Sequence, residues 1–247
     1  MDRMLYVAMA GARQMMTAQA VNTNNLVNAS TTGFREDLAM FDSVPLTGPG
    51  LPSRVYARTD ANGVNLTPGP TVDTGRDLDI SIQGKGWIAV QDPGGGEAYT
   101  RAGNLKITAL GALVTADGLP VLGNSGAPIA IPPADKVEIG RDGTISIQTP
   151  GGGPKSLAVI DRIKLVNPDE ARLYKSDDGL IRLRDGDVAE PDAGVTVRPG
   201  SLEMSNVNAV EAMVDMIALA RQFEMNIKMM NIAKENDSAS AQLMRIT

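Results

Sequence analysis

The stretch NNLVNASTTGF, residues 24–34, interrupts a run that is otherwise uniform in character. Residues 4–23 are mostly helix formers, with Gly11 as the main exception. Three Asn within five residues, a Ser-Thr-Thr run and Gly33 then follow. Asn and Gly are common at helix C-termini, where Gly adopts a left-handed φ that other residues avoid. The stretch therefore predicts the end of an N-terminal helix that spans roughly residues 3–28.

Met, Pro and Gly divide the chain into parts. All 13 Met lie in residues 1–40 or 204–244, all 15 Pro lie between residues 45 and 199, and only two of the 26 Gly lie outside residues 48–200. Met favours helices, whereas Gly and Pro favour turns. The predicted organisation is an N-terminal helix with its signature (1–41), an extended connector (42–70), a central β domain (71–200) and a C-terminal helix (201–247).

Both terminal helices carry apolar stripes, and the second alternates spacings of three and four as a heptad seam does. Further apolar residues widen it, so one partner helix would not cover it, and we expect burial against several neighbours. Ser205 or Asn206 is the expected N-cap of the C-terminal helix. The stripes consist of Leu5, Met9, Ala12 and Met16 in the first helix and of Met213, Met216, Ala220, Phe223, Ile227 and Met230 in the second, widened by Val210, Val214, Ile217 and Met229.

The middle of the chain is predicted to consist of a linker followed by β structure. Residues 42–70 contain five Pro and little periodicity, which predicts an extended connector with one short strand near residues 53–57. Residues 71–200 contain short alternating runs separated by Asp-Gly pairs and other turn signals. The predicted fold class is therefore α+β in several parts, with terminal helices and a central all-β domain of short antiparallel strands. The clearest strands are Leu78–Ile82, Leu105–Thr108, Thr144–Ile147 and Ile163–Val166.

The composition excludes several kinds of function. The chain has no Cys and no His, so thiol chemistry, triads with a His base and zinc sites built from Cys or His are ruled out. The net charge of −6 and scattered basic residues argue against nucleic acid. No run approaches the roughly 20 apolar residues of a membrane span. Asp77 and Asp79 share a predicted strand face and could serve acid–base catalysis, although a solvated strand face explains them more simply.

Several segments, in order along the whole chain, resemble the bacterial flagellar rod and hook proteins. Residues 24–35, NNLVNASTTGFR, resemble the signature of this family. Residues 1–12 and 219–230, MDRMLYVAMAGA and LARQFEMNIKMM, resemble its proximal-rod members in particular. Trp87 and Leu105 stand where Phe is common in the family. The other segments that resemble family motifs are DLDISIQGKGW (77–87), YTRAGNL (99–105) and GSLEMSNVN (200–208).

The resemblance implies a structural subunit of the flagellar basal-body rod, without catalytic, cofactor or metal sites. Its terminal helices would pair as a coiled-coil domain beside the β domain. The implied partners are other copies of the chain, other proximal and distal rod proteins, and the flagellar type III export apparatus, which would export it without a cleaved signal peptide. No nucleic acid and no insertion into the membrane are expected. The rod crosses the periplasm and transmits torque.

Two alternatives stay open at this point. The first is a distal-rod or hook subunit of the same family. The second, from another class, is a periplasmic glycan hydrolase that uses Asp77 and Asp79.

The residues expected to form the assembly interface combine the helix stripes with the signature. Amide and hydroxyl groups of the signature can bond to exposed backbone groups and to neighbouring subunits. The expected interface residues are Leu5, Met9, Met16, Asn24, Asn25, Asn28, Thr31, Gly33, Phe34, Met213, Met216, Ile217, Phe223, Ile227 and Met230.

Overall fold

The chain folds into two compact units, seen in a computed structural model that describes residues 3–45, 55–59, 63–149 and 157–246. We call them the helical unit and the β unit, and the chain passes between them after residues 27, 36, 65 and 207. The helical unit comprises Met1–Val27, Asp37–Asn65 and Asn208–Thr247, and the β unit comprises Asn28–Glu36 and Leu66–Val207.

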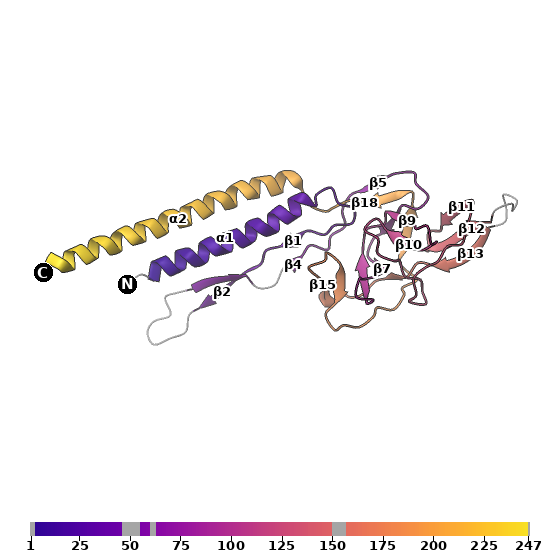
Figure 1. The fold of residues 1–247 in the computed structure, drawn as a ribbon, viewed down its shortest axis with the longest axis horizontal. Coiled ribbons are helices and arrows are strands. Elements are labelled where there is room, and N and C mark those ends of the chain that lie inside the picture. The colour runs from indigo at the N-terminus through magenta and orange to yellow at the C-terminus, as the bar shows by residue number, and fades with distance from the viewer. Residues whose placement is uncertain (1–2, 46–54, 60–62, 150–156, 247) are drawn as a thin grey trace. The chain divides into compact units, whose positions relative to one another are not determined.

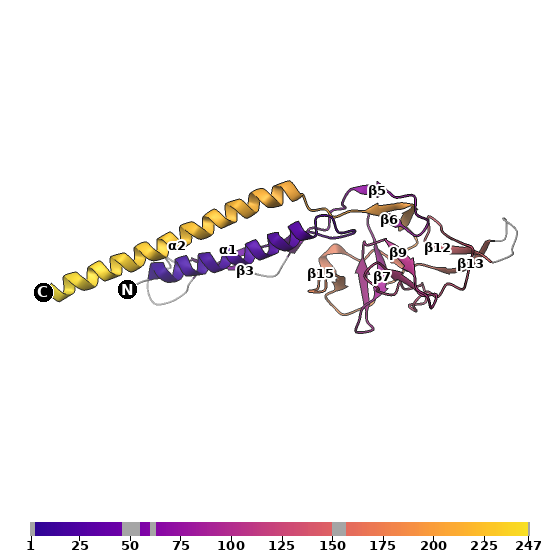
Figure 2. The ribbon, with the colours of Figure 1, turned by 45° about the horizontal axis from the view of Figure 1, so that its top comes forward.

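Two antiparallel helices, α1 (Arg3–Val27) and α2 (Ala209–Ile246), lie side by side in the helical unit (Figures 1 and 2). The observed end of α1 is within one residue of the predicted one. Asn22 Nδ2 donates a hydrogen bond to the carbonyl oxygen of Ala212 at 2.7 Å. Small side chains allow two helices to approach closely. Among the described side chains of this unit, the buried apolar ones are all alanines, namely Ala8, Ala12, Ala18, Ala212 and Ala233.

Short antiparallel strand pairs complete the helical unit. Strand β2 (Phe41–Pro45) pairs with β3 (Val55–Thr59), and β1 (Asp37–Leu38) pairs with β4 (Gly63–Val64). The segment predicted as an extended connector therefore contains paired strands, although part of the strand predicted near residues 53–57 lies outside the described residues. Strands of two residues are too short to show alternation, so the sequence carries little signal for them.

The β unit contains short antiparallel strands, as predicted. Its largest sheet has the order β14-β7-β8-β16-β15, a second has the order β11-β12-β13, and β9 pairs with β10. The glycines of its Asp-Gly turns have φ of 87°, 83°, 82° and 72°, which confirms those turns. The strands are β7 (Trp87–Gln91), β8 (Glu97–Thr100), β9 (Leu105–Ile107), β10 (Leu113–Thr115), β11 (Lys136–Ile139), β12 (Thr144–Gln148), β13 (Leu157–Arg162), β14 (Leu165–Val166), β15 (Leu173–Lys175) and β16 (Ile181–Leu183), with a 3-10 turn, η1 (Glu170–Arg172), before β15.

The first and last strands of the β unit pair with each other. Strand β6 (Ile80–Gln83) pairs with β17 (Thr196–Pro199), and β5 (Thr71–Asp73) pairs with β18 (Ser201–Glu203). These pairs bring the start of the unit beside the segment that leads to α2. A continuous aliphatic core fills the unit, and its fully buried members include Ile80, Ile88, Leu105, Leu113, Ile145 and Ile163.

Helix α2 begins later than the sequence predicted. Its N-cap is Asn208, whose Oδ1 accepts hydrogen bonds from two N–H groups of the first helical turn at 3.1 and 3.4 Å. The predicted caps, Ser205 and Asn206, accept backbone N–H groups inside the β unit instead. Both Ser and Asn are favourable N-cap residues, so residue type alone does not distinguish Ser205, Asn206 and Asn208.

Candidate assembly site

Residues 28–36, which we call the signature segment, form a tight turn in the β unit. The N–H of Thr31 donates to the carbonyl oxygen of Asn28 at 3.1 Å, and Thr31 Oγ1 pairs with Asn28 Oδ1 at 3.1 Å. The N–H of Phe34 then donates to the carbonyl oxygen of Thr31 at 3.4 Å. Two polar side chains of the signature therefore shape the turn itself, as Asn and Thr commonly do in turns.

Gly33 packs directly against another backbone segment of the β unit. Its φ is 70°, which confirms the predicted left-handed conformation. A Cβ at this position would lie 2.3 Å from the backbone of Arg101 and Ala102. The N–H of Gly33 also donates to the carbonyl oxygen of Glu203 at 2.8 Å. Because α1 already ends at Val27, the glycine is required for this close approach and does not cap the helix.

A buried cluster of charges holds the signature segment in place. Arg35, Arg101 and Glu203 are only 2%, 4% and 1% exposed. Arg35 Nη2 donates to Glu203 Oε1, and Arg101 Nη1 donates to Glu203 Oε2 at 2.8 Å. The two guanidinium carbons lie 5.7 and 5.2 Å from the centre of the Trp87 ring, a distance at which the ring face attracts cations. Burial lowers the pKa of Arg101, and the charge of Glu203 opposes that effect.

Lys175, on β15, adds a second attachment for the signature segment. Its Nζ donates to the carbonyl oxygen of Arg35 at 2.8 Å and lies 3.9 Å from the centre of the Phe34 ring. The ammonium group thus holds the backbone and the aromatic side chain together. Phe34 was predicted as an assembly residue, and in the chain it is half-buried against this lysine.

Asn25, the buried member of the signature, lies in the helical unit. Its Oδ1 accepts the N–H of Asp37 at 2.9 Å, and its Nδ2 donates to the carbonyl oxygen of the same residue at 2.8 Å. The amide therefore pairs with the backbone as a neighbouring strand would, and fixes the start of β1 against α1. This is the bonding to exposed backbone groups that the sequence predicted for the signature amides.

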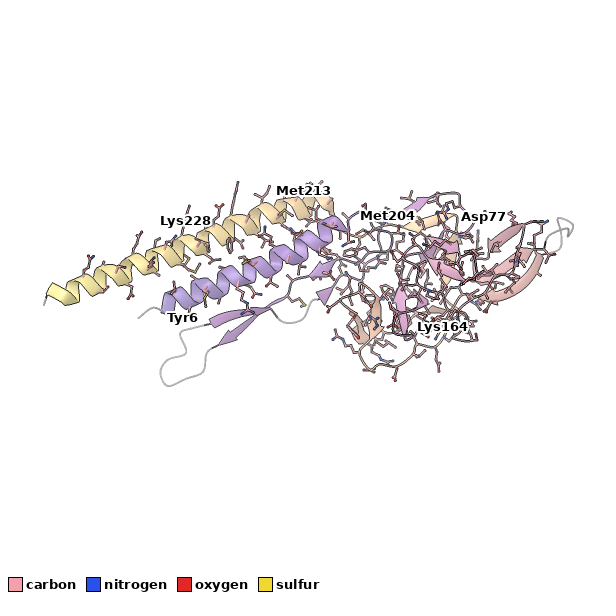
Figure 3. All side chains as sticks on the ribbon, in the orientation of Figure 1. Tyr6, Asp77, Lys164, Met204, Met213 and Lys228 are labelled. Carbon is pink, nitrogen blue, oxygen red and sulfur yellow. The ribbon has the colours of Figure 1, made fainter. Side chains whose placement is uncertain are left out.

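Several bulky apolar side chains of both helices are exposed. Met213 and Ile217 are 53% and 56% exposed, and Figure 3 shows Met213 on the side of α2 that faces away from α1. With Val210 and Val214 they form one strip over the first two turns of α2, which we call the α2 strip. The prediction that one partner would not cover this helix agrees with the structure.

The predicted stripe of α1 is not its buried face. Of its four residues only Ala12 is buried, whereas Met9 and Met16 are exposed. The buried apolar side chains of α1 are the alanines Ala8, Ala12 and Ala18, and small side chains of this kind allow two helices to approach closely.

The structure separates the predicted interface residues by exposure and brings them together only in part. Asn28, Thr31, Gly33 and Phe34 lie in one turn of the β unit, and the others lie in the helical unit. Asn25 is buried; Leu5, Asn28, Gly33, Phe34, Met216, Phe223, Ile227 and Met230 are half-buried; Met9, Met16, Asn24, Thr31, Met213 and Ile217 are exposed.

Sequence reasoning missed Arg35, Arg101, Glu203 and Asn206 as site residues. Each lies in a segment that resembles a family motif, and that was the available signal. Charged residues that lie so far apart in the sequence cannot be recognised as partners until the fold is known.

Asp77 and Asp79 do not share a solvated strand face, so that interpretation is corrected. Asp77 is exposed, whereas Asp79 is 1% exposed and accepts a hydrogen bond from Thr74 Oγ1 at 2.7 Å. Both lie before β6 begins, so the strand periodicity does not apply to them. Across the described ranges, no cluster of three or more Asp, Glu, His or Cys could hold a metal ion. In the same part of the chain, no helix combines the length and apolar character needed to span a membrane.

Comparisons with known proteins agree with the arrangement of these motifs. Residues 81–147 match the family model described as the flagellar hook protein FlgE/F/G D1 domain, and residues 198–243 match that of the flagellar basal body rod FlgEFG protein C-terminal region. The flagellar basal-body rod protein FlgF of Salmonella typhimurium and that of Escherichia coli are each 41% identical to the chain over the full length of both proteins. The rod protein FlgG of Bacillus subtilis is 32% identical, covering 95% of the chain and 96% of FlgG.

These matches define the class as flagellar rod and hook proteins, which are structural proteins and not enzymes. Within that class the chain belongs to the FlgF family of flagellar basal-body rod proteins. It is a structural subunit of the flagellar rod.

Proposed function

We propose that the chain occupies the proximal part of the rod, where α1 and α2 pair as a coiled-coil domain that assembles with other copies and with other proximal and distal rod proteins. The assembly forms a helical shaft that crosses the periplasm and carries torque. The type III export apparatus of the flagellum delivers the subunit without a cleaved signal peptide.

The α2 strip is the observation that carries this proposal. Val210, Met213, Val214 and Ile217 follow one another on one side of the helix and are all exposed. Fully burying such a side chain contributes about 1.5–3 kcal/mol, so contact with neighbouring subunits would stabilise an assembly substantially. Met9 and Met16 offer similar surface on α1, and flexible Met side chains suit contacts with more than one partner.

A helical shaft requires contacts between different surfaces that repeat without closing into a ring. Two helices with separate exposed apolar faces provide such surfaces. Stiffness then comes from many packed contacts. The remaining predicted residues, including Asn24 of the helical unit and Thr31 of the β unit, are proposed to contribute polar contacts to neighbouring subunits.

The alternative position, in the distal rod or hook, rests on the similarity to FlgG. The 41% identity to the FlgF proteins of Salmonella typhimurium and Escherichia coli, against 32% to the FlgG of Bacillus subtilis, favours the proximal position. Deleting the gene and imaging basal bodies tests it. An arrest before the proximal rod is complete supports the proposal, whereas a complete proximal rod that lacks a distal rod or a hook would contradict it.

Changing the α2 strip tests the assembly mechanism. Met213→Asp should abolish motility, because the buried contact would contain an unpaired charge at a cost of several kcal/mol. Met213→Leu preserves the apolar surface and should support motility. Val188→Asp is the matched control, since Val188 is an exposed apolar residue of the β unit. Normal motility of Met213→Asp would refute the role of the strip.

A further inference from the structure

Three segments of the β unit continue directly into the helical unit. They are residues 28–36, 66–70 and 203–207, and between them they contain the β-unit ends of all four chain passages. Any force that travels along the chain from one unit to the other passes through these segments. If the three segments are bonded to one another, they resist such a force together; if they are not, each segment resists it alone.

Glu203 bonds to both of the other segments. Its Oε1 accepts the N–H of Gly69 at 3.0 Å and also the guanidinium of Arg35. Its carbonyl oxygen accepts the N–H of Gly33 at 2.8 Å. One residue thus ties the signature segment and residues 66–70 to the last strand of the β unit.

Asn206 repeats the pattern three residues later. Its Oδ1 accepts the N–H of Glu36 at 2.8 Å, and its Nδ2 donates to the carbonyl oxygen of Thr67 at 3.0 Å. Its own N–H donates to the carbonyl oxygen of Phe34 at 3.4 Å. The same three segments are therefore bonded a second time, nearer to the points where the chain leaves the β unit.

Arg101 fixes this arrangement to the body of the β unit. It follows β8, and besides Glu203 it bonds through Nη2 to the carbonyl oxygen of Gly84 at 2.8 Å. The buried cluster contains two guanidinium groups and a single carboxylate. Glu203 is therefore needed to separate and neutralise positive charges that have little access to water.

We propose that Glu203 is the positioning residue of a load-bearing joint, which makes the three connecting segments act as one and transfers force from them to the β sheets. We call this set of contacts, centred on Glu203 and Asn206, the linker clamp. The inference rests on the proposed role of the rod in carrying torque. It assigns to the clamp a function distinct from that of the α2 strip, since the clamp stiffens the subunit and the strip joins subunits.

The first test is amide hydrogen exchange on the purified full-length chain. Glu203→Gln should accelerate exchange at Gly33, Glu36 and Gly69 by at least about tenfold, because local opening of the segments becomes easier. Glu97→Gln is the matched control, since Glu97 forms a buried ion pair with Lys164 (Figure 3) at 2.8 Å elsewhere in the β unit. The control should leave exchange at those three amides unchanged. Equal exchange in the two variants would overturn the clamp.

A second variant covers the case in which Glu203→Gln does not fold. Asn206→Ala removes the side-chain bonds to Glu36 and Thr67 without leaving an unpaired buried charge, and it should accelerate exchange at Glu36. Unchanged exchange there would equally overturn the proposal.

The second test measures swimming under load in cells that lack the native gene and express each variant. Glu203→Gln should still form basal bodies with hooks, but its speed should fall more steeply than that of Glu97→Gln as medium viscosity rises. Identical responses of the two variants would overturn a load-bearing role. Failure of the native chain to restore basal bodies would instead contradict the proposed function. The exchange experiment on the purified chain tests the linker clamp independently of that outcome.

Discussion

The two units of the chain bury opposite kinds of side chain. In the β unit many of the fully buried residues are large, with Tyr99, Ile88 and Leu105 among them. In the described part of the helical unit the buried apolar residues are alanines, and many Met and Val side chains are exposed. The β unit therefore completes its core within one chain. The helical unit leaves large apolar side chains available to other chains, so its stability should depend on assembly.

The largest expected effect is a cavity in the core of the β unit. Ile88→Ala removes a fully buried side chain and should lower the free energy of unfolding by about 2–5 kcal/mol. Urea unfolding of the purified chain, followed by Trp87 fluorescence, measures this effect. A loss below about 1 kcal/mol would show that the β unit is less tightly packed than the structure indicates.

The next effect concerns the signature glycine. Gly33→Ala should be more destabilising than Gly118→Ala, because both positions have positive φ but only Gly33 has backbone atoms within 2.3 Å of a new Cβ. The conformational cost shared by both variants is about 1–2 kcal/mol. Thermal unfolding of the two variants isolates the steric cost. Equal destabilisation would show that the signature segment is not tightly seated on the β unit.

A pH dependence should arise from Tyr99. Burial raises its pKa to about 12 from the ordinary 10.0, although the N–H of Ala189 donates to its hydroxyl oxygen and opposes the shift. Above pH 10 the unfolded chain loses this proton first, so the free energy of unfolding should fall between pH 10 and 12. The total loss is at most about 3 kcal/mol. Tyr99→Phe cannot ionise and should give a flatter curve in that range; parallel curves would contradict the assignment.

The smallest expected effect is on the isolated chain carrying Met213→Asp. Because Met213 is exposed, the free energy of unfolding of this variant should differ from that of the native chain by no more than about 0.5 kcal/mol, even though assembly should fail. Urea unfolding of this variant beside the native chain provides the measurement. A large loss of monomer stability would mean that the residue is part of the helical unit's own core, and the contrast between the two units would then weaken.

The sequence predicts the elements well because their signals are local. The end of α1 follows from the Asn-rich stretch, and the turns of the β unit follow from Asp-Gly pairs such as Asp117-Gly118. The resemblance to the flagellar rod and hook proteins additionally predicts the family, because segments similar to its motifs are spread along the whole chain. The α+β fold class can be predicted from these local signals without knowing any long-range contact.

The parts that sequence does not predict depend on which segments meet. The spacing of Met9 and Met16 does not tell which apolar side chains of α1 are buried within one chain; these are Ala8, Ala12 and Ala18. Asn206 looks like a helix cap, yet it bridges two linker segments. Glu203 and Arg35 are separated by most of the chain, so nothing in the local pattern pairs them. The signature therefore contributes to the internal architecture through Asn25, Gly33 and Arg35, beyond the surface role that its polar residues suggest.

Methionine oxidation tests most directly the claim that the helices expose surface for assembly. Brief peroxide treatment followed by mass spectrometry compares the free chain with purified basal bodies, because exposed Met converts to the sulfoxide. Met204 of the β unit is half-buried and serves as the internal reference. The account predicts that Met9, Met16 and Met213 oxidise rapidly in the free chain and slowly in the rod, while Met204 changes little. Equal oxidation of Met213 in both forms would contradict it.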